Sequence, residues 1–467
     1  MIPSAIVLSH DEQLERLRRG CPEAVPAAQV VGDPCIDQLH ASAPFRDAYR
    51  EALGVAAGQK LILLTTTWGA QSLLGRSVDT IRRTLAELPQ DGYRVIAAVH
   101  PNVWYGHGGW QLHSWLKPFL RAGLLLPPPA GDTWKAAICA ADAFVGDHGS
   151  LTLYAAAHGI PGLLASFDDS CVAPDSAMDR LGRLLPRLSP APLRPQIEDV
   201  LRRHRTDDRT ADAAALADAA ALADAAALVT SRPGQALARL RRLCYAYLKL
   251  TEPPAPAVPH PVLVPERPAP PPRLPGQPLF VDARVDTGQH GHPTVTLRRY
   301  PADLQAGPDT HLGDHPHLVA EEGEPDPRWR SAADILVAHR ARPQELFGSH
   351  PGCDLVAVRS AHDTATVRLF LRDGTEFTAH CPDASPEAEP AVAASVLHAC
   401  LSHDADAGNA GNARDTGDAG NAGNAGDIDV TVRFGGRTAR LSLRRTGQPT
   451  ARLLGPDAAD LPVRGQG

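Results

Sequence analysis

The sequence predicts an α/β fold, with a Rossmann-like parallel sheet in the first half of the chain and a small α+β domain in the second. The first observation is that short apolar runs alternate with amphipathic runs between residues 33 and 200, which is typical of right-handed βαβ units. The second is that apolar and polar residues alternate in several runs after residue 276, which is typical of β-hairpins. Residues 201–275, rich in alanine and proline, predict a linker between the two domains.

The first domain is expected to contain five parallel strands covered by helices on both faces. Leu61 to Leu64 is continuously apolar, as expected of a strand that is buried on both sides. The expected strands are Lys60 to Thr65, Arg94 to Val99, Gly123 to Leu126, Ala143 to Gly146 and Gly162 to Ala165. The expected helices are Val78 to Leu88, Leu112 to Arg121, Thr133 to Ala140 and Leu151 to His158. Before them, residues 1–32 predict a strand (Ser4 to Leu8), a helix (Glu12 to Arg19) and a second strand (Ala28 to Val31).

The linker has two parts of different composition. Between Ala211 and Leu228 the sequence Ala-Asp-Ala-Ala-Ala-Leu occurs three times, and alanine favours a helix. A period of six residues spreads Leu216, Leu222 and Leu228 about 120° apart, so this helix has no core-facing side and is expected to be exposed. From Pro253 to Pro275, eleven of 23 residues are proline, which predicts an extended spacer.

The second domain, residues 276–450, shows two hairpin patterns. Val367, Leu369 and Leu371 alternate up to Asp373-Gly374, and a similar alternation surrounds Gly435-Gly436. Helices are expected near Ser331 to Ala341 and Ala391 to Leu401. Residues 403–427 form a glycine-rich insertion without proline, which excludes collagen and predicts disorder. We associate no family with this domain, which is a candidate surface for a protein partner.

The composition excludes several classes of function. A formal net charge of -7 argues against nucleic acid as a partner. The eight cysteines are scattered without C-x-x-C pairs, and no apolar run approaches the roughly 20 residues of a transmembrane helix, so a cytoplasmic protein is expected. The phosphate loop of nucleotide triphosphatases and the G-x-S-x-G elbow of serine hydrolases are both absent. Five histidines of the second domain lack metal-ligand spacing, so no metal is expected: His290, His292, His311, His315 and His317.

The expected ligand position lies at the carboxyl ends of the first and fourth strands of the first domain. In doubly wound sheets the ligand binds where the strand order reverses. The loops there are Thr65-Thr66-Thr67-Trp68-Gly69 and the segment from Gly146 to Thr152. Their small residues allow the backbone to approach an anion, and a helix beginning near Ser150 would direct free N–H groups toward a diphosphate.

These motifs, in this order, resemble a known family. Gly32-Asp33-Pro34 followed by Asp37, the Thr-rich loop, His100-Pro101-Asn102, and the loop from Asp147 to Thr152 followed by Ala155, Gly159 and Pro161 are similar to the C-terminal half of GT-B glycosyltransferases. CDP-glycerol glycerophosphotransferases and the UDP-N-acetylglucosamine 2-epimerase group are the most similar members. The resemblance implies that residues 33–200 are a GT-B C-terminal-like nucleotide-binding domain, and that residues 1–32 are a remnant of an acceptor domain with its interdomain strand.

The resemblance also implies the site. His148 and His100 would be catalytic, with His148 beside the leaving diphosphate. The donor nucleotide would contact Thr67, Gly69, Asp147, Gly149, Ser150, Thr152 and Tyr154, where Tyr154 replaces the carboxylate that grips the ribose in many relatives. The expected ligand is a UDP- or CDP-linked sugar or polyol phosphate, with no other cofactor.

Each of these residues also has a structural interpretation. His100 would end a strand by a hydrogen bond to the backbone, and Asp37 would cap a helix or turn. The aromatic residues Trp104, Tyr105, Trp110 and Trp115 form either a sugar or base platform or the packing beneath a loop. At the level of the chain, either a longer gene supplies the acceptor domain of a transferase, or the chain is a non-catalytic nucleotide- or protein-binding protein derived from a GT-B half.

Overall fold

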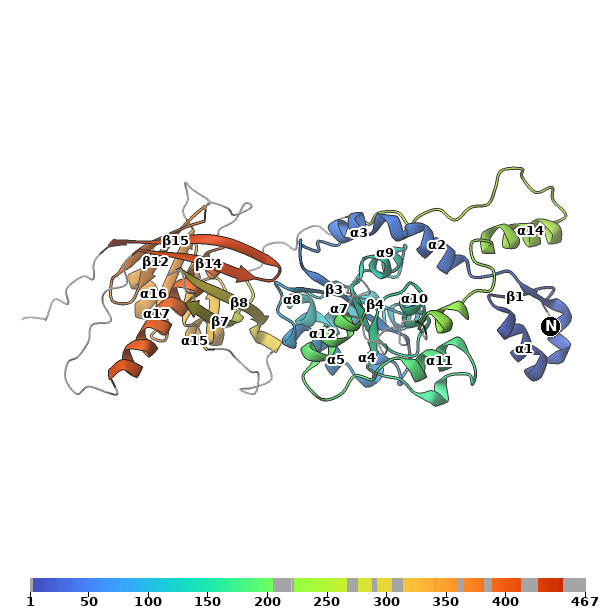
Figure 1. Ribbon diagram of the computed structural model, residues 1–467, viewed down its shortest axis with the longest axis horizontal. Coiled ribbons are helices and arrows are strands. Elements are labelled where there is room, and N and C mark those ends of the chain that lie inside the picture. The colour runs from blue at the N-terminus through green and yellow to red at the C-terminus, as the bar shows by residue number, and fades with distance from the viewer. Residues whose placement is uncertain are drawn as a thin grey trace, which may run out of the picture. The chain divides into compact units, whose positions relative to one another are not determined.

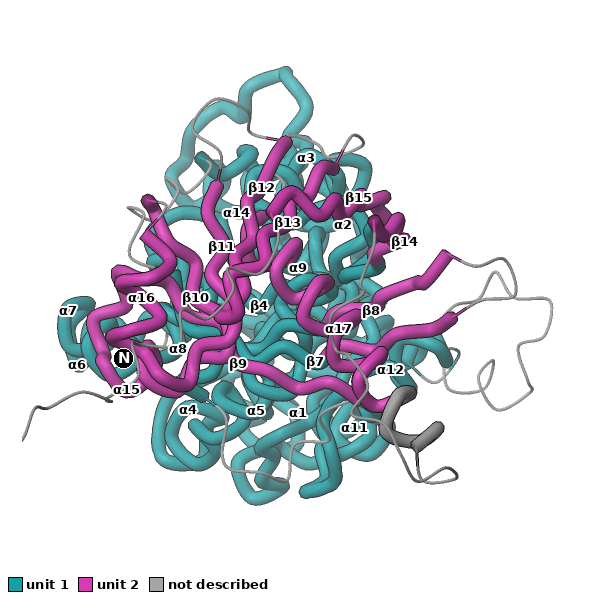
Figure 2. The backbone as a smooth tube through the Cα atoms, turned by 90° about the vertical axis from the view of Figure 1, so that its left-hand side faces the viewer, with its two compact units in different colours: residues 1–282, 298–313, 433–437 teal, residues 283–297, 314–432, 438–467 magenta. Residues whose placement is uncertain are grey.

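A computed structural model describes the protein in two compact units (Figures 1 and 2). The described residues are 3–204, 220, 222–266, 276–287, 292–304, 314–340, 342–359, 365–381, 389–412 and 427–447. Unit 1 comprises residues 1–282, 298–313 and 433–437, and unit 2 comprises residues 283–297, 314–432 and 438–467. The boundaries between the units therefore pass through strands β7 (Leu279–Thr287), β8 (Pro293–Pro301), β14 (Ile428–Phe434) and β15 (Arg437–Gly447).

The central sheet of unit 1 has four parallel strands in the order β4-β3-β5-β6. Their bounds are Lys60–Thr66 (β3), Tyr93–Val99 (β4), Ala143–Gly146 (β5) and Gly162–Leu164 (β6). The five-stranded prediction is wrong in one strand, because the segment from Gly123 to Leu126 makes only an isolated bridge from Leu125 to Ile96 of β4. Its place beside β4 keeps the Rossmann-like order of strands.

Strand β3 shows why the sheet is covered on both faces. Leu61 and Leu63 belong to one buried core cluster, and Ile62 and Leu64 belong to the other, as the alternation of side chains along a strand requires. The first cluster includes side chains of α2 (Pro34–Ser42), α3 (Arg46–Ala52), α9 (Thr133–Ala140), α10 (Ser150–Ala157) and α11 (Ala177–Leu184). The second includes side chains of α4 (Leu73–Arg76), α5 (Asp79–Glu87), α6 (Pro101–His107), α7 (Gly109–Trp115) and α12 (Leu193–Arg203), with α8 (Lys117–Arg121) following α7.

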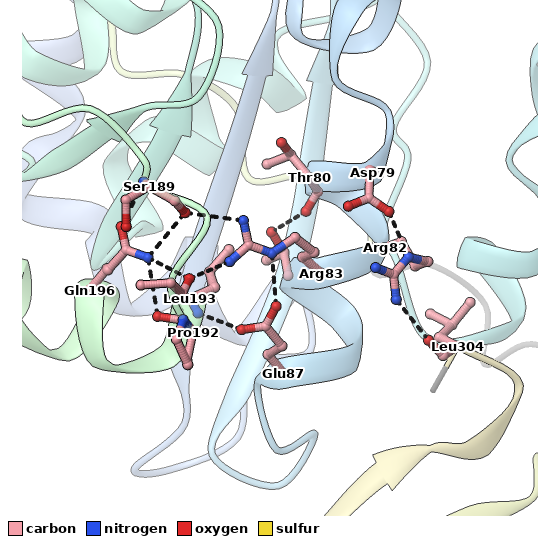
Figure 3. Close-up of polar contacts among 12 residues, drawn as sticks. Asp79, Thr80, Arg82, Arg83, Glu87, Ser189, Pro192, Leu193, Gln196 and Leu304 are labelled. Atoms are coloured by element: carbon pink, nitrogen blue, oxygen red, sulfur yellow. Dashed lines mark hydrogen bonds and ion pairs between the residues drawn. The ribbon is translucent and has the colours of Figure 1, made fainter. Parts of the chain in front are cut away.

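Polar contacts fix α12 against α5 (Figure 3). The Arg83 guanidinium donates to the carbonyl oxygens of Ser189 and Ala191 and pairs with Glu87. Glu87 in turn accepts the backbone N–H of Leu193, the first residue of α12. This carboxylate satisfies one of the free N–H groups at the start of that helix and adds a favourable charge there.

The first residues of the chain have the predicted order. A two-stranded parallel sheet pairs β1 (Ile6–Leu8) with β2 (Ala28–Val30), and α1 (Asp11–Gly20) connects them. Short 3-10 turns lie at Pro22–Ala27, Ala43–Phe45 and Asp169–Cys171. Asp37 caps a helix, as its structural interpretation predicts: its carboxylate accepts the N–H groups of Gly234 and Ala236 at the start of α14 (Ala236–Leu248).

The linker is not uniformly exposed. Residues 205–219 and 221 of the alanine-rich stretch lie outside the described residues, but Leu222 packs against a core cluster and Ala225 is buried. In the proline-rich stretch, Val262 is buried, its N–H donates to Ser42 Oγ at 2.9 Å, and its carbonyl accepts the Tyr49 hydroxyl at 2.7 Å. The expectation of an exposed connector is therefore wrong at both places, where apolar side chains pack against the rest of unit 1.

Unit 2 contains most of a closed barrel of nine strands, in the order β10-β11-β12-β13-β15-β14-β8-β7-β9. The remaining bounds are His317–Glu321 (β9), Ile335–Ala338 (β10), Leu355–Arg359 (β11), Thr366–Leu371 (β12) and Glu376–His380 (β13). The two expected hairpins are present, as β12–β13 around Asp373-Gly374 and β14–β15 around Gly435-Gly436. The barrel itself was not expected from the sequence, which predicted only a small α+β domain.

The helices of this second domain agree with prediction in part. The helix expected from Ser331 to Ala341 is wrong, because α15 (Pro327–Ala332) ends there and strand β10 follows. The helix expected from Ala391 to Leu401 is present as α17 (Pro390–Asn412), which extends into the insertion predicted at 403–427. Residues 413–426 of that insertion lie outside the described residues. The described residues of the second half of the chain also form helix α16 (Pro343–Ser349) and a 3-10 turn at Ala302–Leu304.

Candidate functional site

The candidate site lies at the carboxyl edge of the sheet in unit 1. Strands β3, β5 and β6 end at Thr66, Gly146 and Leu164, and the loops that follow them are joined by hydrogen bonds. The Ser166 hydroxyl donates to the carbonyl of Gln71 at 2.8 Å, which connects the loop after β6 to the loop after β3. In a doubly wound sheet this edge is where ligands bind.

A buried carboxylate holds the two predicted loops together. Asp147 has no exposed surface, and its Oδ2 accepts the N–H groups of Thr67 at 2.8 Å and Leu73 at 2.9 Å. Its Oδ1 accepts the N–H of Gly149 at 2.9 Å. Burial raises the pKa of the Asp147 carboxyl, while the three N–H donors oppose that rise by stabilising the ionised form. Asp147 therefore acts on the backbone of the site and is a positioning residue.

Two glycines allow the loops to approach each other closely. A Cβ on Gly149 would lie 2.8 Å from Thr67 Cβ, and a Cβ on Gly146 would lie 2.3 Å from Thr65 Oγ1. Gly149 is also the N-cap of α10 and provides no side chain to accept the first N–H groups of that helix. Among the described residues we find no hydrogen bond to the N–H of Ser150, which is exposed. The start of α10 thus keeps free donors for an anion.

His148 lies between these elements with an unsatisfied nitrogen. Its Nδ1 is buried and has no hydrogen-bond partner in the described part of the chain. Its ring meets Phe167 edge-on with ring centroids 6.3 Å apart, and the Arg187 guanidinium covers Phe167 at 4.3 Å from that ring's centroid. A buried nitrogen without a partner is costly, so a ligand or water that bonds to it would be stabilising.

His100 has the local contact that its structural interpretation predicts. Its Nδ1 accepts the N–H of Asn102 at 3.0 Å, as the N-cap of α6. The neutral ring therefore carries its proton on Nε2 and remains able to donate. Burial lowers the pKa of His100, and the negative charge of Asp147 partly opposes this. The exposed Trp68 ring lies near it, with ring centroids 6.4 Å apart, and Gly69 follows at a positive φ of 91°.

Two predicted donor contacts are engaged inside the protein. Thr152 is fully buried, and its hydroxyl lies 2.8 Å from the Thr65 hydroxyl, which joins α10 to β3. The Tyr154 hydroxyl donates to Asp33 Oδ2 at 2.9 Å, and burial raises its pKa. Their contacts with a donor stay predictions, and the structure gives both residues a role in holding α10.

Sequence reasoning missed the residues after β6. Ser166, Phe167 and Asp168 lie at the same edge, and Asp168 Oδ2 is 3.9 Å from the Arg76 guanidinium. No motif distinguishes these residues, and only their place after a parallel strand could have indicated them. The aromatic cluster is divided: Trp104 is buried, whereas Tyr105, Trp110 and Trp115 are exposed.

Two of the five histidines singled out in the second domain lie beside other histidines: the ring centroids of His315 and His403 are 5.8 Å apart, and those of His317 and His398 are 4.6 Å apart. Among the described residues no group of three or more His, Cys, Asp or Glu side chains could hold a metal ion. His317 Nε2 lies 2.8 Å from the Ser395 hydroxyl, and both residues are buried. His290 and His311 lie outside the described residues. In the described chain, every helix is too short or too polar to cross a bilayer.

Comparisons with known proteins give only distant likenesses. No family model matches the sequence, and no curated protein matches it. The wall teichoic acid polymerase TagF is 14% identical with a TM-score of 0.36, over 53% of this chain and 57% of that chain. WaaG, a glycosyltransferase involved in lipopolysaccharide biosynthesis, is 15% identical with a TM-score of 0.29, over 49% of this chain and 60% of that chain.

HepE of Anabaena, solved with UDP-glucose, is 12% identical with a TM-score of 0.31, over 53% of this chain and 64% of that chain. The matched part of this chain thus spans less than two thirds of each of these three structures. At these scores the likenesses carry no argument about what this chain binds or does.

Proposed function

We propose that unit 1 binds the nucleoside diphosphate part of a UDP- or CDP-linked donor, and that the chain is a GT-B-like transferase or its donor-binding half. The transferred group would be a sugar or a polyol phosphate. The observation that supports this most is the set of hydrogen bonds made by Asp147, which fix the loops after β3 and β5. They hold the start of α10, where the N-cap Gly149 has no side chain, next to the loop after β3. Backbone N–H groups held in this way are suited to a diphosphate.

The chemistry of transfer places negative charge on the departing diphosphate. The Gly149 N–H already donates to Asp147, so the Ser150 N–H is a backbone donor at the start of α10 that remains for a phosphate oxygen. His148 would donate from its unsatisfied nitrogen, and His100 from Nε2. Donors fixed before the reaction stabilise developing charge without reorganising, and one such donor is typically worth about 3 to 4 kcal/mol in the barrier.

The second candidate is a non-catalytic protein that binds a nucleotide or another protein. Tyr154 favours it, because its hydroxyl is engaged by Asp33 and α10 offers no carboxylate to the ribose. In this case the site would retain phosphate donors and lose the group that orients the sugar. The second domain, residues 276–450, would supply a protein-binding surface.

Calorimetric titration of the full chain with UDP, CDP, GDP and dTDP tests both candidates. Saturable binding of UDP or CDP, followed by release of that diphosphate from UDP-glucose or CDP-glycerol, supports the transferase. Binding without turnover supports the second candidate. If none of the four nucleotides binds at about millimolar concentration, which corresponds to roughly 4 kcal/mol, the nucleotide site is wrong.

A further inference from the structure

A cavity of about 700 Å³ opens at the amino edge of the same sheet. Lys60 and Tyr93 line it, and they are the first residues of β3 and β4, where they pair in register. Asp142 and Pro161, which also line it, directly precede β5 and β6. Because the strands are parallel, this edge is opposite to the one that carries His148 and the start of α10. The cavity is therefore separate from the candidate donor site.

The carboxylates around this cavity are already engaged. Asp142 Oδ1 accepts from the Arg46 guanidinium at 3.0 Å, and Oδ2 accepts from Arg50 at 2.8 Å and from the Leu61 N–H at 2.8 Å. Glu198 accepts from Arg194 at 2.7 Å and from the Tyr93 hydroxyl at 3.3 Å. These partners offset the negative charges of the two carboxylates, and Arg46 is occupied by Asp142 and by the carbonyl oxygens of Cys139 and Ala141.

The Lys60 ammonium group has donors that could bond to a ligand. Its Nζ lies 3.8 Å from Asp142 Oδ1, which is beyond hydrogen-bond distance, and its side chain is 44% exposed. No hydrogen bond to this ammonium group is found among the described residues. A lysine ammonium has three donors and is a strong partner for a phosphate oxygen.

The His158 ring belongs to the same wall. Its Nδ1 is buried and has no hydrogen-bond partner within the described ranges. Burial lowers the pKa of His158 to about 4, with the charges of His40 and Arg46 acting in the same direction, so the ring is neutral at pH 7. An anion beside it would have the opposite effect on its pKa. Ala43, Ile160 and Leu201 provide apolar surface beside these polar groups.

We propose that this cavity binds a small phosphorylated molecule, whose phosphoryl group contacts Lys60 and His158 and whose organic part covers Ile160 and Leu201. The volume lies in the range of about 300 to 1,000 Å³ that small-molecule sites occupy. The Glu198 carboxylate and the Tyr93 hydroxyl lie in the same wall and suit the hydroxyl groups of a sugar or polyol. This site is independent of the donor site proposed above, because no residue is shared between the two.

The test uses the full chain and three probes at constant ionic strength: inorganic phosphate, glucose 6-phosphate and glucose. Titration is followed by calorimetry and by the NMR signal of the His158 ring. We expect saturable binding of glucose 6-phosphate, weaker binding of phosphate and no binding of glucose. The pKa of His158 should rise when glucose 6-phosphate is bound. Lys60→Gln should weaken binding roughly tenfold or more, because it removes a charge-assisted hydrogen bond.

Lys249→Gln is the matched control, since it removes an exposed lysine far from the cavity in the sequence. Equal weakening by both variants would mean general electrostatic attraction and would overturn the proposal. Absence of saturable binding would overturn it as well, and so would loss of binding when UDP or CDP is added. If Lys60→Gln unfolds the chain, His158→Gln is tested in its place. An unchanged affinity of the folded His158→Gln protein for glucose 6-phosphate would overturn the proposal.

Discussion

The carboxylate of Asp147 accepts the backbone N–H of Thr67 at 2.8 Å, across 80 residues of sequence. This bond and those to Leu73 and Gly149 set the distance between the loops that follow β3 and β5. The loops carry four of the predicted donor contacts, Thr67, Gly69, Asp147 and Gly149, and α10 carries the other three, Ser150, Thr152 and Tyr154. Their geometry therefore depends on one buried side chain, whose predicted contact with the donor stays a prediction.

Asp147→Asn should destabilise unit 1 by about 1 to 3 kcal/mol, because the amide turns one acceptor into a donor that faces backbone N–H groups. Chemical denaturation measures the loss. Asp169→Asn is the control, since that carboxylate is 83% exposed and should change stability little. If the two variants unfold at the same denaturant concentration, the carboxylate does not hold the loops.

Gly149→Ala tests the close approach of the two loops. The added Cβ would lie 2.8 Å from Thr67 Cβ and 2.9 Å from Asp147 Oδ1, so the loops must separate. We expect a loss of about 1 to 3 kcal/mol in stability from this overpacking, together with weaker UDP or CDP binding. Gly106→Ala is the matched control, because nothing lies within 4 Å of its added Cβ. A Gly149→Ala protein as stable as the control would show that the backbone adapts freely.

His148→Ala should lower nucleotide binding or transfer far more than it lowers the melting temperature. The reason is that the ring meets Phe167 edge-on and leaves Nδ1 unsatisfied, so its removal breaks no hydrogen bond found in the described part of the chain. Binding of UDP and CDP and thermal melting are measured on the same samples. His339→Ala, at an exposed position, is the control. Proportionate losses in binding and in melting temperature would identify a structural histidine.

The parallel sheet could be predicted because its strands are short apolar runs whose signals are local. Lys60 to Thr65 and Ala143 to Gly146 were placed within one residue, and the ends of these strands then located Thr67 and Asp147. The barrel could not be predicted, since its closure joins β9 to β10 and β7, and no local pattern reports which strands are neighbours. Strand β10 was mistaken for a helix because a four-residue apolar run has no distinguishable period.

Contacts made by single side chains could not be predicted from the sequence either. Nothing in the local pattern distinguishes Asp33, which bonds to Tyr154 across 121 residues, from an ordinary helix cap. The same holds for Leu222 and Ala225, whose repeat has no apolar stripe and still contributes buried surface. An apolar stripe indicates a helix that packs along its length. A helix that packs only at its end needs no such stripe, so the sequence pattern does not indicate its packing.

The stability of unit 2 should fall as the pH drops below about 6.5. Burial, with the charge of His398 second, lowers the pKa of His317 to about 3, whereas the unfolded chain has the ordinary value near 6.5. Between these values the unfolded state binds one more proton at this site, which costs at most about 1.4 kcal/mol per pH unit. His398 is shifted in the same direction.

Denaturation of the full chain at a series of pH values measures this slope. His317→Gln should reduce the slope between pH values of about 3.5 and 6 whatever its effect on stability at neutral pH, because it removes the titrating group. His339→Gln should leave the slope unchanged, since that residue is exposed. A slope that is the same in all three proteins would assign the acid sensitivity to other groups.

The last prediction concerns protease cleavage in the linker and follows from the buried position of Val262. The sequence predicts protease cleavage between residues 205 and 277 and between 403 and 427, with a fragment of residues 28–200 that keeps any nucleotide binding. In the structure Val262 is 4% exposed and held by Ser42 and Tyr49, while Leu263 is 88% exposed. Cleavage in the linker should therefore fall before Leu222 or after Val262, and residues 222–262 should remain bound to the rest of unit 1.

Hydrogen exchange provides the residue-level test. The Val262 amide should exchange slowly, because it donates to Ser42 Oγ at a buried position, whereas the Leu263 and Val264 amides should exchange quickly. Ser42→Ala removes the acceptor and should make the Val262 amide exchange as fast as its neighbours. Uniformly fast exchange in the unmodified chain, or cleavage between residues 229 and 262, would restore the interpretation of this segment as a free spacer.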